Sequence, residues 1–260
     1  MTVKKNKSPR ILFYDIEVSY TVGAVWGLYD QNVAGVIRDP YMLSFAYKWY
    51  GEKTTKVLSL PMMGGYNKNK KCDKKLVQEL WKLFDEADII IAHNGNSFDQ
   101  KWAYSRFLLN GMKPPSPSKY IDTKIVAKSL FRFNSNSLNN LAKYFGIGSK
   151  VDTGGIDLWI DCIENDLSSA WRKMEVYNKM DVVLLEKVYL KMVPYIINHP
   201  NLNLYLDSRM NCPNCGVNKL IKHKLRFSRT GARQQYKCGD CGAYCTGEVI
   251  KKKSNEPLAR

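Results

Sequence analysis

The chain has 260 residues, 45% of them hydrophobic, and a formal net charge of +16. This length is enough for one α/β domain and a small second module. No apolar run approaches the roughly 20 residues that span a bilayer, and the basic N-terminus lacks the apolar core of a secretory signal. We therefore expect no membrane partner and a cytoplasmic protein, or one in the host cytoplasm if it is viral. The charge favours nucleic acid as the partner, although a basic solvated surface would give the same count.

The first strand is predicted at residues 10–19, after a basic tail at residues 1–9. Its apolar run contains two carboxylates, Asp15 and Glu17. Side chains alternate faces along a strand, so both carboxylates point to the same face. Like charges on one face of a buried strand are costly unless a cation lies between them. This strand therefore predicts the floor of a divalent-metal site.

Strands and helices follow in an order that predicts an α/β fold with a mixed sheet. Antiparallel strands are expected at residues 22–29, 42–50 and 54–60, a buried strand of the parallel type at 88–92, and a short strand at 120–122. Helices are expected at residues 73–86, from a cap at Ser97 to about Leu109, and at 123–131, 137–145, 156–163 and 168–199, the last broken near Pro194.

Two later carboxylates can complete the metal site. Asp99 follows the apolar strand at 88–92 after a short turn. Asp181 lies on a predicted helix four residues after Tyr177, and therefore on the same helical face as that tyrosine. A strand, a helix start and a late helix can converge at one end of a mixed sheet. Carboxylate oxygens are hard ligands, which suit Mg²⁺ or Mn²⁺ rather than zinc.

Three motifs give the chain a resemblance to the DEDD-superfamily 3′→5′ exonucleases, above all to the proofreading domain of family B DNA polymerases. The motifs, in the order of that family, are Asp15-Ile-Glu17, Asn94-x-x-x-Phe98-Asp99 and Tyr177-x-x-x-Asp181. Residues 121–123 and 135–146 are similar to the middle segment of that family, so the resemblance covers roughly residues 10–197. It implies an RNase H-like mixed sheet flanked by helices.

The third motif separates two branches of this superfamily. One branch has a histidine five residues before the last aspartate, and here Val176 stands at that position. Tyr177, four residues before Asp181, makes the chain similar to the tyrosine branch, DEDDy.

The resemblance also implies roles for these residues. Two Mg²⁺ or Mn²⁺ ions about 3.5–4 Å apart would clamp the scissile phosphate. Asp15 would bridge both ions, Glu17 and Asp181 would hold the ion on the nucleophile side, and Asp99 would serve the second ion. Tyr177 would orient the attacking water, because a phenol with a pKa of about 10 is a poor general base at neutral pH.

Four further residues lie at or near the second motif and the next predicted strand. The resemblance places Asn94 in the groove that binds a single strand. Phe98 fits either the core or a wedge against the substrate. Asp122, at the end of a predicted strand, fits a helix cap better than a metal ligand. His93 matches no catalytic histidine of the family, so we expect a structural role.

Four cysteines predict a second metal site in the C-terminal part. They form two Cys-x₂-Cys knuckles, each followed by glycine, at Cys212, Cys215, Cys238 and Cys241. Four thiolates at this spacing indicate one structural Zn²⁺ and resemble a zinc ribbon. Two basic strands joined at residues 229–231 are expected between the knuckles. One face would offer five cations to phosphates: Lys222, Lys224, Arg226, Arg233 and Lys237. A protein-docking or purely stabilising module is the alternative.

Charge also divides the chain near residue 205. Residues 209–260 contain 12 Lys/Arg and 3 Asp/Glu, a net charge of 12 − 3 = +9, whereas the first 208 residues contain 28 and 21, a net charge of +7. We expect a basic tail at 1–9, an exonuclease domain at 10–200, a zinc ribbon at 209–250 and a second basic tail at 251–260.

The function that fits these features is a stand-alone, metal-dependent 3′→5′ exonuclease. Its substrate would be the 3′ end of single-stranded or frayed DNA, in proofreading, repair or degradation. The remaining residues cannot contain a polymerase domain, so proofreading would require a separate polymerase or another replication or repair protein. An exoribonuclease with the same fold and a non-catalytic, DNA-binding adaptor are the alternatives.

Overall fold

The computed structural model describes residues 8–29, 32–206, 210–228 and 231–250. The described chain divides into two compact units, one formed by Arg10–Val188 and the other containing Tyr189 and the residues that follow. The predicted tails lie almost wholly outside the described residues, as do Arg229 and Thr230 of the predicted ribbon turn. No helix in the described ranges is long and apolar enough to cross a membrane.

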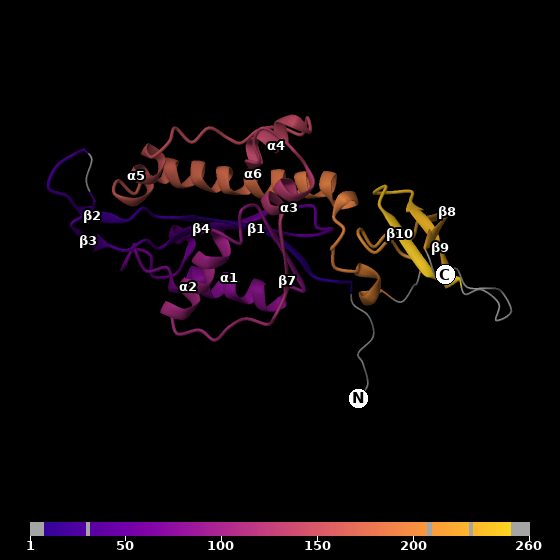
Figure 1. The fold of residues 1–260 in the computed structure, drawn as a ribbon. Coiled ribbons are helices and arrows are strands. Elements are labelled where there is room, and N and C mark those ends of the chain that lie inside the picture. Colours follow the sequence, from indigo (N-terminus) through magenta and orange to yellow (C-terminus); the bar gives the residue numbers. More distant parts are fainter. Residues whose placement is uncertain (1–7, 30–31, 207–209, 229–230, 251–260) are drawn as a thin grey trace. The chain divides into compact units, whose positions relative to one another are not determined.

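The first unit is built on a five-stranded mixed sheet in the order β5-β4-β1-β6-β7 (Figure 1). Strand β1 pairs antiparallel with β4 on one side and parallel with β6 on the other. Strand β5 extends the antiparallel side and β7 the parallel side. The strands are β1 (Ile11–Val18), β4 (Met42–Trp49), β5 (Lys56–Ser59), β6 (Ile89–Ala92) and β7 (Lys119–Asp122). The predicted mixed sheet is confirmed.

Helices cover both faces of this sheet (Figure 1). They are α1 (Lys74–Glu86), α2 (Asp99–Leu109), α3 (Thr123–Leu130), α4 (Leu138–Tyr144), α5 (Asp157–Ile163) and α6 (Ser168–Met192). Helices α1 and α2 pack on the apolar face of β1, where the ring of Tyr14 meets Phe84 of α1 edge-on at 4.9 Å. The predicted break at Pro194 is a 3₁₀ turn, Val193–Tyr195, that follows α6.

The opposite face of the sheet is polar where it meets α6. Ser44 of β4 donates a 3.0 Å hydrogen bond from its hydroxyl to the Oδ1 of Asn178. Lys48 of the same strand forms a 2.6 Å ion pair with Glu186. Because buried polar groups are costly without partners, these contacts hold α6 in one register on the sheet. That register determines which residues of α6 face Asp15 and Glu17.

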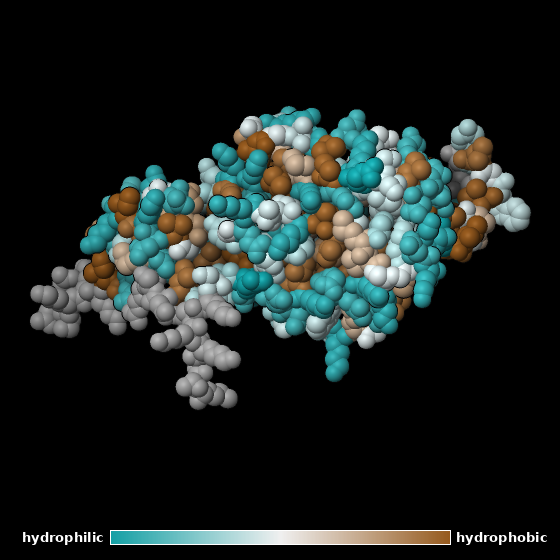
Figure 2. Space-filling model, turned by 180° about the vertical axis from the view of Figure 1, so that it is seen from behind, coloured by the Kyte–Doolittle hydropathy of each residue, from teal (hydrophilic) through white to brown (hydrophobic). Residues whose placement is uncertain are grey.

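The prediction of a sheet strand at residues 22–29 is wrong. Strand β2 spans only Val22–Ala24 and pairs with β3 (Gly35–Arg38) in a separate two-stranded hairpin. The apolar residues that made the segment resemble a strand do not face a core, since Trp26, Leu28 and Tyr29 are 94%, 87% and 84% exposed. Figure 2 shows this hydrophobic hairpin tip at the right edge of the first unit.

The second unit contains a three-stranded antiparallel sheet in the order β10-β9-β8. Strands β8 (Leu220–Ser228) and β9 (Gly231–Cys238) are the two expected strands between the cysteine knuckles. The third strand, β10 (Tyr244–Ile250), follows the second knuckle and was not expected. Leu202–Tyr205 forms a 3₁₀ turn in the segment that precedes the first knuckle.

Candidate active site and cysteine cluster

Strand β1 runs past the end of its parallel neighbour. The β1–β6 pairing stops at Phe13, so Asp15 and Glu17 lie where β1 has no neighbouring strand on that side. The first residue of α2, Asp99, occupies this edge, and its Oδ1 accepts a 3.1 Å hydrogen bond from the backbone N–H of Ile16. The β1 edge therefore brings the second motif beside the first.

Three of the four predicted carboxylates converge on one point. Each of Asp15, Glu17 and Asp181 offers an oxygen, and these oxygens lie within 4.8 Å of one another. Alternation along β1 puts the first two on the same face, and α6 contributes the third. Asp99 is not in this group, and its Oδ1 accepts the backbone N–H of Ile16. Its charge nevertheless contributes to the raised pKa of Asp15.

Burial and mutual repulsion disfavour ionisation of this cluster. Burial, followed by the charges of Asp99 and Asp181, raises the pKa of Asp15 well above its ordinary value. Burial and the Asp181 charge raise the pKa of Glu17 to about 8. Burial raises the pKa of Asp99 to about 7, even though the N–H of Ile16 favours its ionised form. A cation at this point would remove much of the repulsion.

Lys150, in the segment between α4 and α5, contributes a cation that sequence reasoning missed. Its ammonium group forms an ion pair with Asp181 and donates a 3.2 Å hydrogen bond to the hydroxyl of Tyr177. Burial lowers the pKa of Lys150, but the Asp181 and Asp15 carboxylates outweigh burial and raise it overall. The backbone N–H of Lys150 is held by the Oδ1 of Asn139 at 3.0 Å. No spacing in the sequence signals this lysine.

Asn178 is a second residue that sequence reasoning missed. It is fully buried on α6, and its Nδ2 donates a 2.7 Å hydrogen bond to the Oδ2 of Asp15. Its Oδ1 accepts from Ser44, so the amide connects β4 to the Asp15 carboxylate. Asn178 therefore fixes which oxygen of Asp15 remains available to a ligand. In the sequence, the position of Asn178 directly after Tyr177 and three residues before Asp181 indicates that it lies near the site.

Tyr177 lies with its hydroxyl at the carboxylate cluster. Its ring packs against Trp159 of α5, with centroids 6.3 Å apart and planes at 72°. Burial, together with the Asp181 charge, raises the pKa of its phenol further above the ordinary value. A phenol that stays protonated can orient a water through a hydrogen bond but cannot abstract a proton at neutral pH.

The second motif begins in a tight turn that precedes α2. Asn94 has a positive φ of 67°, and its N–H donates to the Oδ1 of Asp122 at 2.9 Å. A Cβ on Gly95 would come within 2.5 Å of the Ala92 side chain, so this turn requires glycine. Phe98 is 39% exposed, which places its ring outside the core.

The predicted cap at Ser97 is wrong. Asn94 accepts the backbone N–H groups of Ser97 and Phe98 in this turn, so α2 begins only at Asp99, with no side-chain cap.

Two neighbouring residues have the structural roles that we expected. Asp122 accepts the backbone N–H groups of Lys124 and Ile125 and thus caps α3. The His93 ring lies with Nδ1 2.9 Å from the Thr123 hydroxyl and with Nε2 3.0 Å from the Asn136 carbonyl. Burial lowers the pKa of His93 to about 4, so the ring is neutral at pH 7.

The residues of the carboxylate cluster fit a divalent cation. The Oδ1 of Asp181 is buried, and it has no hydrogen-bond partner among the described residues. A buried oxygen without a partner is costly unless a ligand satisfies it. The donor set consists of carboxylate oxygens, which Mg²⁺ and Mn²⁺ prefer.

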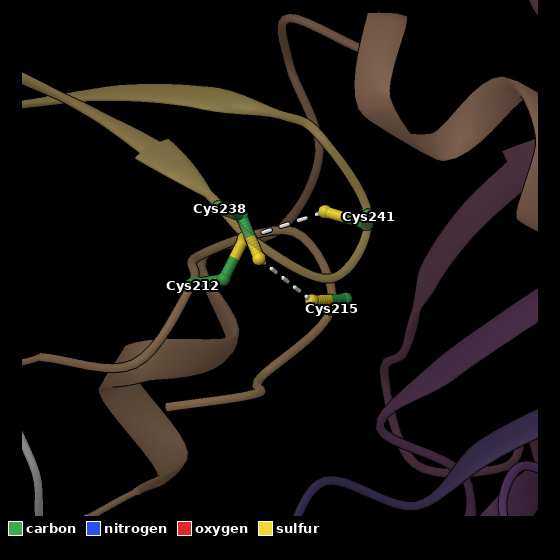
Figure 3. Close-up of side chains that lie close together, drawn as sticks. All are labelled: Cys212, Cys215, Cys238 and Cys241. Carbon is green, nitrogen blue, oxygen red and sulfur yellow. Dashed lines mark hydrogen bonds between the residues drawn. The ribbon is translucent and has the colours of Figure 1, made fainter. Parts of the chain in front are cut away.

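The four predicted zinc ligands also converge (Figure 3). The sulfur atoms of Cys212 and Cys241 are 3.7 Å apart, and those of Cys215 and Cys238 are 3.8 Å apart. A tetrahedral site with Zn–S bonds of about 2.3 Å places its sulfurs about 3.8 Å apart. The two pairs therefore match a Cys₄ zinc site.

The turn of each knuckle depends on the glycine that follows its second cysteine. Gly216 and Gly242 have φ values of 76° and 82°, which side chains rarely adopt. Their N–H groups donate to the carbonyls of Cys212 and Cys238 at 2.8 and 3.1 Å. These bonds close the turn of each knuckle, and all four sulfurs lie within 4.8 Å of one another. The composition and pairing of this unit are consistent with a small zinc ribbon.

The prediction of one basic ribbon face is wrong for Lys222. Lys222 is opposite Tyr236, whereas Arg226 is opposite Arg233, with a bulge in β8 between them. Residues opposite each other share a face, and positions 236 and 233 of β9 lie on different faces. Lys222 is therefore on the face opposite to Arg226.

The other four predicted cations lie on the face of Arg226 or within the bulge. Arg226 and Arg233 share their face with Lys237, whose ammonium lies 5.9 Å from the ring centroid of Tyr244. Lys224 lies within the bulge, and all five predicted cations are exposed.

Comparison with known proteins identifies the family. A family model described as the RNase H superfamily matches residues 31–193, more than half of the chain. The chain belongs to the RNase H superfamily. The match includes Asp99, Tyr177 and Asp181, and the mixed sheet flanked by helices is the RNase H-like fold that we predicted. Membership of this superfamily supports a nuclease-type function that acts on nucleic acid.

One similar solved structure is the family B DNA polymerase from the hyperthermophilic archaeon Pyrobaculum calidifontis. Sequence identity is 15%, the TM-score is 0.46, and the similar region covers 85% of this chain. It spans 31% of the polymerase chain. No curated protein matches the sequence.

Proposed function

We propose that the chain is a metal-dependent 3′→5′ exonuclease that hydrolyses phosphodiester bonds at the 3′ ends of single-stranded or frayed DNA. The observation that carries this proposal is the convergence of Asp15, Glu17 and Asp181 within 4.8 Å. Asp99 lies beside them on the β1 backbone, and Tyr177 presents a protonated hydroxyl to the same cluster.

The chain's own residues would have distinct tasks in this reaction. Asp15, Glu17, Asp99 and Asp181 would hold two Mg²⁺ or Mn²⁺ ions. Such ions supply charge neutralisation at the scissile phosphate and a water of lowered pKa. Asn178 keeps the Asp15 carboxylate oriented through its 2.7 Å hydrogen bond. Tyr177 would position the attacking water, and Asn94 and Phe98 would contact the strand near its 3′ end.

We also propose that the four cysteines hold one structural Zn²⁺ in a ribbon that adds a nucleic-acid contact. The ribbon would occupy residues 209–250, after an exonuclease domain at residues 10–200. Its support is the sulfur geometry together with the five exposed cations of β8 and β9. A separate polymerase or another replication or repair protein would be the partner if the enzyme proofreads.

A digestion panel tests the proposed activity. The substrates are 5′-labelled single-stranded DNA, duplex DNA, mismatched duplex and RNA, each with Mg²⁺ or Mn²⁺. We expect labelled products that shorten from the 3′ end, with single-stranded and mismatched DNA degraded fastest. RNA degraded in preference to DNA would indicate an exoribonuclease with the same carboxylates. Binding without cleavage of any substrate would indicate the adaptor.

Two matched variants test the site itself. Asp181→Asn preserves the shape of the side chain and removes its charge, so it should abolish cleavage. Asp157→Asn on α5 is the control, because Asp157 is exposed and lies outside the cluster. Undiminished cleavage by Asp181→Asn would overturn the metal assignment.

A further inference from the structure

The segment from Thr123 to Lys150 has an unusual charge pattern beside the candidate active site. It contains five Lys/Arg and no Asp or Glu: Lys124, Lys128, Arg132, Lys143 and Lys150. Its carbonyl at Asn136 lies 3.0 Å from the Nε2 of His93, the residue just before the second motif. At its end, Lys150 reaches Asp181. The segment is therefore tied to the site at two points and presents only positive charge.

Three aromatic rings form a stack on this segment. The rings of Phe131 and Phe133 are 5.3 Å apart with planes at 30°, and those of Phe133 and Tyr144 are 5.7 Å apart with planes at 23°. Phe145 meets Phe133 edge-on at 5.8 Å and supports it from the side. The stack connects the irregular segment after α3 to the end of α4. The rings of each pair are offset, with planes 23–30° apart, so the stack is an aromatic surface on this segment.

The Tyr144 end of this stack is open to solvent. Phe133 covers one face of the Tyr144 ring, yet the residue remains 51% exposed. Two exposed cations, Arg132 and Lys143, adjoin stacked rings in the sequence. A ring that served only to pack the core would not be half exposed, so Tyr144 is available for contact with a ligand.

We propose that Tyr144 is a stacking platform for a base of the strand whose 3′ end lies in the site, with Arg132 and Lys143 binding the adjacent phosphates. This inference rests on the proposed function for the direction of the strand. Aromatic rings accept any base, because every base has a π face, and cations along the backbone make such contacts independent of sequence. The ligand is thus a single-stranded nucleic acid, with one of its bases stacked on Tyr144.

The test measures binding without cleavage, on the full-length, zinc-loaded protein. A 5′-fluorescent oligothymidylate is titrated in the absence of Mg²⁺ and Mn²⁺, and anisotropy gives the Kd. Tyr144→Leu keeps apolar bulk and removes the ring, so we expect the Kd to rise by about 5- to 150-fold. Tyr144→Phe keeps the ring and should bind within about twofold of the parent.

An oligonucleotide with a walking abasic site separates stacking from other contacts and needs no variant. In the parent protein, removal of one base at a single distance from the 3′ end should weaken binding, and Tyr144→Leu should make the protein insensitive to that position. Equal Kd values for Tyr144→Leu and parent, or an equal loss on normal and fully abasic strands, would overturn the proposal. Melting temperatures check that each variant folds. If Tyr144→Leu does not fold, the absence of a sensitive abasic position in the parent decides against the platform.

The digestion panel and this binding assay can fail independently. Loss of binding in Tyr144→Leu without any cleavage by the parent would support the platform and reject the exonuclease. Cleavage by the parent, together with unchanged binding in Tyr144→Leu, would support the exonuclease and reject the platform.

Discussion

The ammonium group of Lys150 lies 3.2 Å from the hydroxyl of Tyr177, and it also forms an ion pair with the buried carboxylate of Asp181. A protein cation thus lies among the carboxylates that we propose as metal ligands. Burial raises the pKa of Asp181, and the charge of Lys150 opposes this effect by favouring the ionised form. The lysine and a divalent ion would compete for the same oxygens, because each supplies the positive charge that the cluster needs.

Lys150→Met should therefore destabilise the metal-free protein and increase the effect of metal. Loss of the ammonium leaves Asp181 with an unpaired buried charge, which should lower the free energy of unfolding by about 1–3 kcal/mol. Saturating Mg²⁺ should then raise the melting temperature more in the variant than in the parent. Calorimetric titration with Mn²⁺ should likewise show tighter binding to the variant.

Lys173→Met is the matched control, since the ammonium of Lys173 donates to the Thr153 carbonyl at an exposed position away from the carboxylate cluster. Equal metal-induced shifts in Lys150→Met and parent would show that the lysine and the metal do not compete.

Tyr177→Phe should lower kcat by up to about a hundredfold and leave KM nearly unchanged. The hydroxyl would orient the attacking water, and misplacement of a reacting group costs rates of this order. The raised pKa of the phenol means that the parent's pH–rate profile should show no ionisation of Tyr177 below pH 10. Steady-state kinetics on single-stranded DNA across pH 6–9 provide the measurement. A variant with parental kcat would remove Tyr177 from the proposed reaction.

Sequence patterns correctly predicted the strands and helices whose apolar residues are buried in the folded protein. Strand β1 and the parallel-type strand β6 are apolar runs of the right length, and α1 has an unbroken apolar stripe. The hairpin at β2 was mistaken for a sheet strand because Trp26, Leu28 and Tyr29 are apolar but exposed. Periodicity reports which residues could be buried, and the presence of a covering element must come from the tertiary structure.

In the candidate site, too, local patterns could be predicted and tertiary contacts could not. Its carboxylates could be predicted because each motif links a residue type to a local element. Lys150 could not, since its role depends on the path of the segment between α4 and α5 back to Asp181. The position of Asn178 beside Tyr177 indicated that it lies near the site, but its bond to Asp15 depends on the register of α6. The bulge in β8 is of the same kind, because a single extra residue moves Lys222 to the other face without any change in composition.

Removal of zinc should unfold the ribbon and leave the first unit folded. Structural zinc supplies much of the folding free energy of such small modules, whereas Arg10–Val188 has its own apolar core. A membrane-permeant zinc chelator that spares Mg²⁺ should release one Zn²⁺ per chain. The far-UV CD signal at 222 nm should remain, because helices α1 to α5 lie in the first unit. Cys238→Ser should reproduce this result, and loss of the whole helical signal would contradict it.

Arg226 and Arg233 should dominate the binding of phosphates by the ribbon. They lie directly opposite each other on β8 and β9, and like charges in that arrangement repel unless an anion lies between them. The observed binding constant, Kobs, for single-stranded DNA falls as salt rises, and each phosphate that a cation neutralises adds about 0.7 to the steepness of log Kobs against log [salt]. Replacing both arginines by Gln should therefore make this line less steep by about 1.4. Lys222→Gln, on the opposite face, should change the slope by less than half as much. Equal changes per charge would mean that the face is irrelevant.

His93 should make the stability of the first unit depend on pH in the acid range. Burial lowers its pKa from 6.5 in the unfolded chain to about 4 in the folded protein. Between these values the unfolded state binds more protons, so stability is full above pH 6.5 and is lost as pH falls towards 4. The slope due to this group is at most about 1.4 kcal/mol per pH unit. His93→Gln lacks this pH-dependent loss of stability. The difference in unfolding free energy between parent and variant should therefore shrink from pH 7 to pH 4.5, because only the parent loses stability through residue 93. Urea denaturation followed at 222 nm measures that difference, and a difference that stays constant across this range would mean that the ring does not stay neutral in the folded protein.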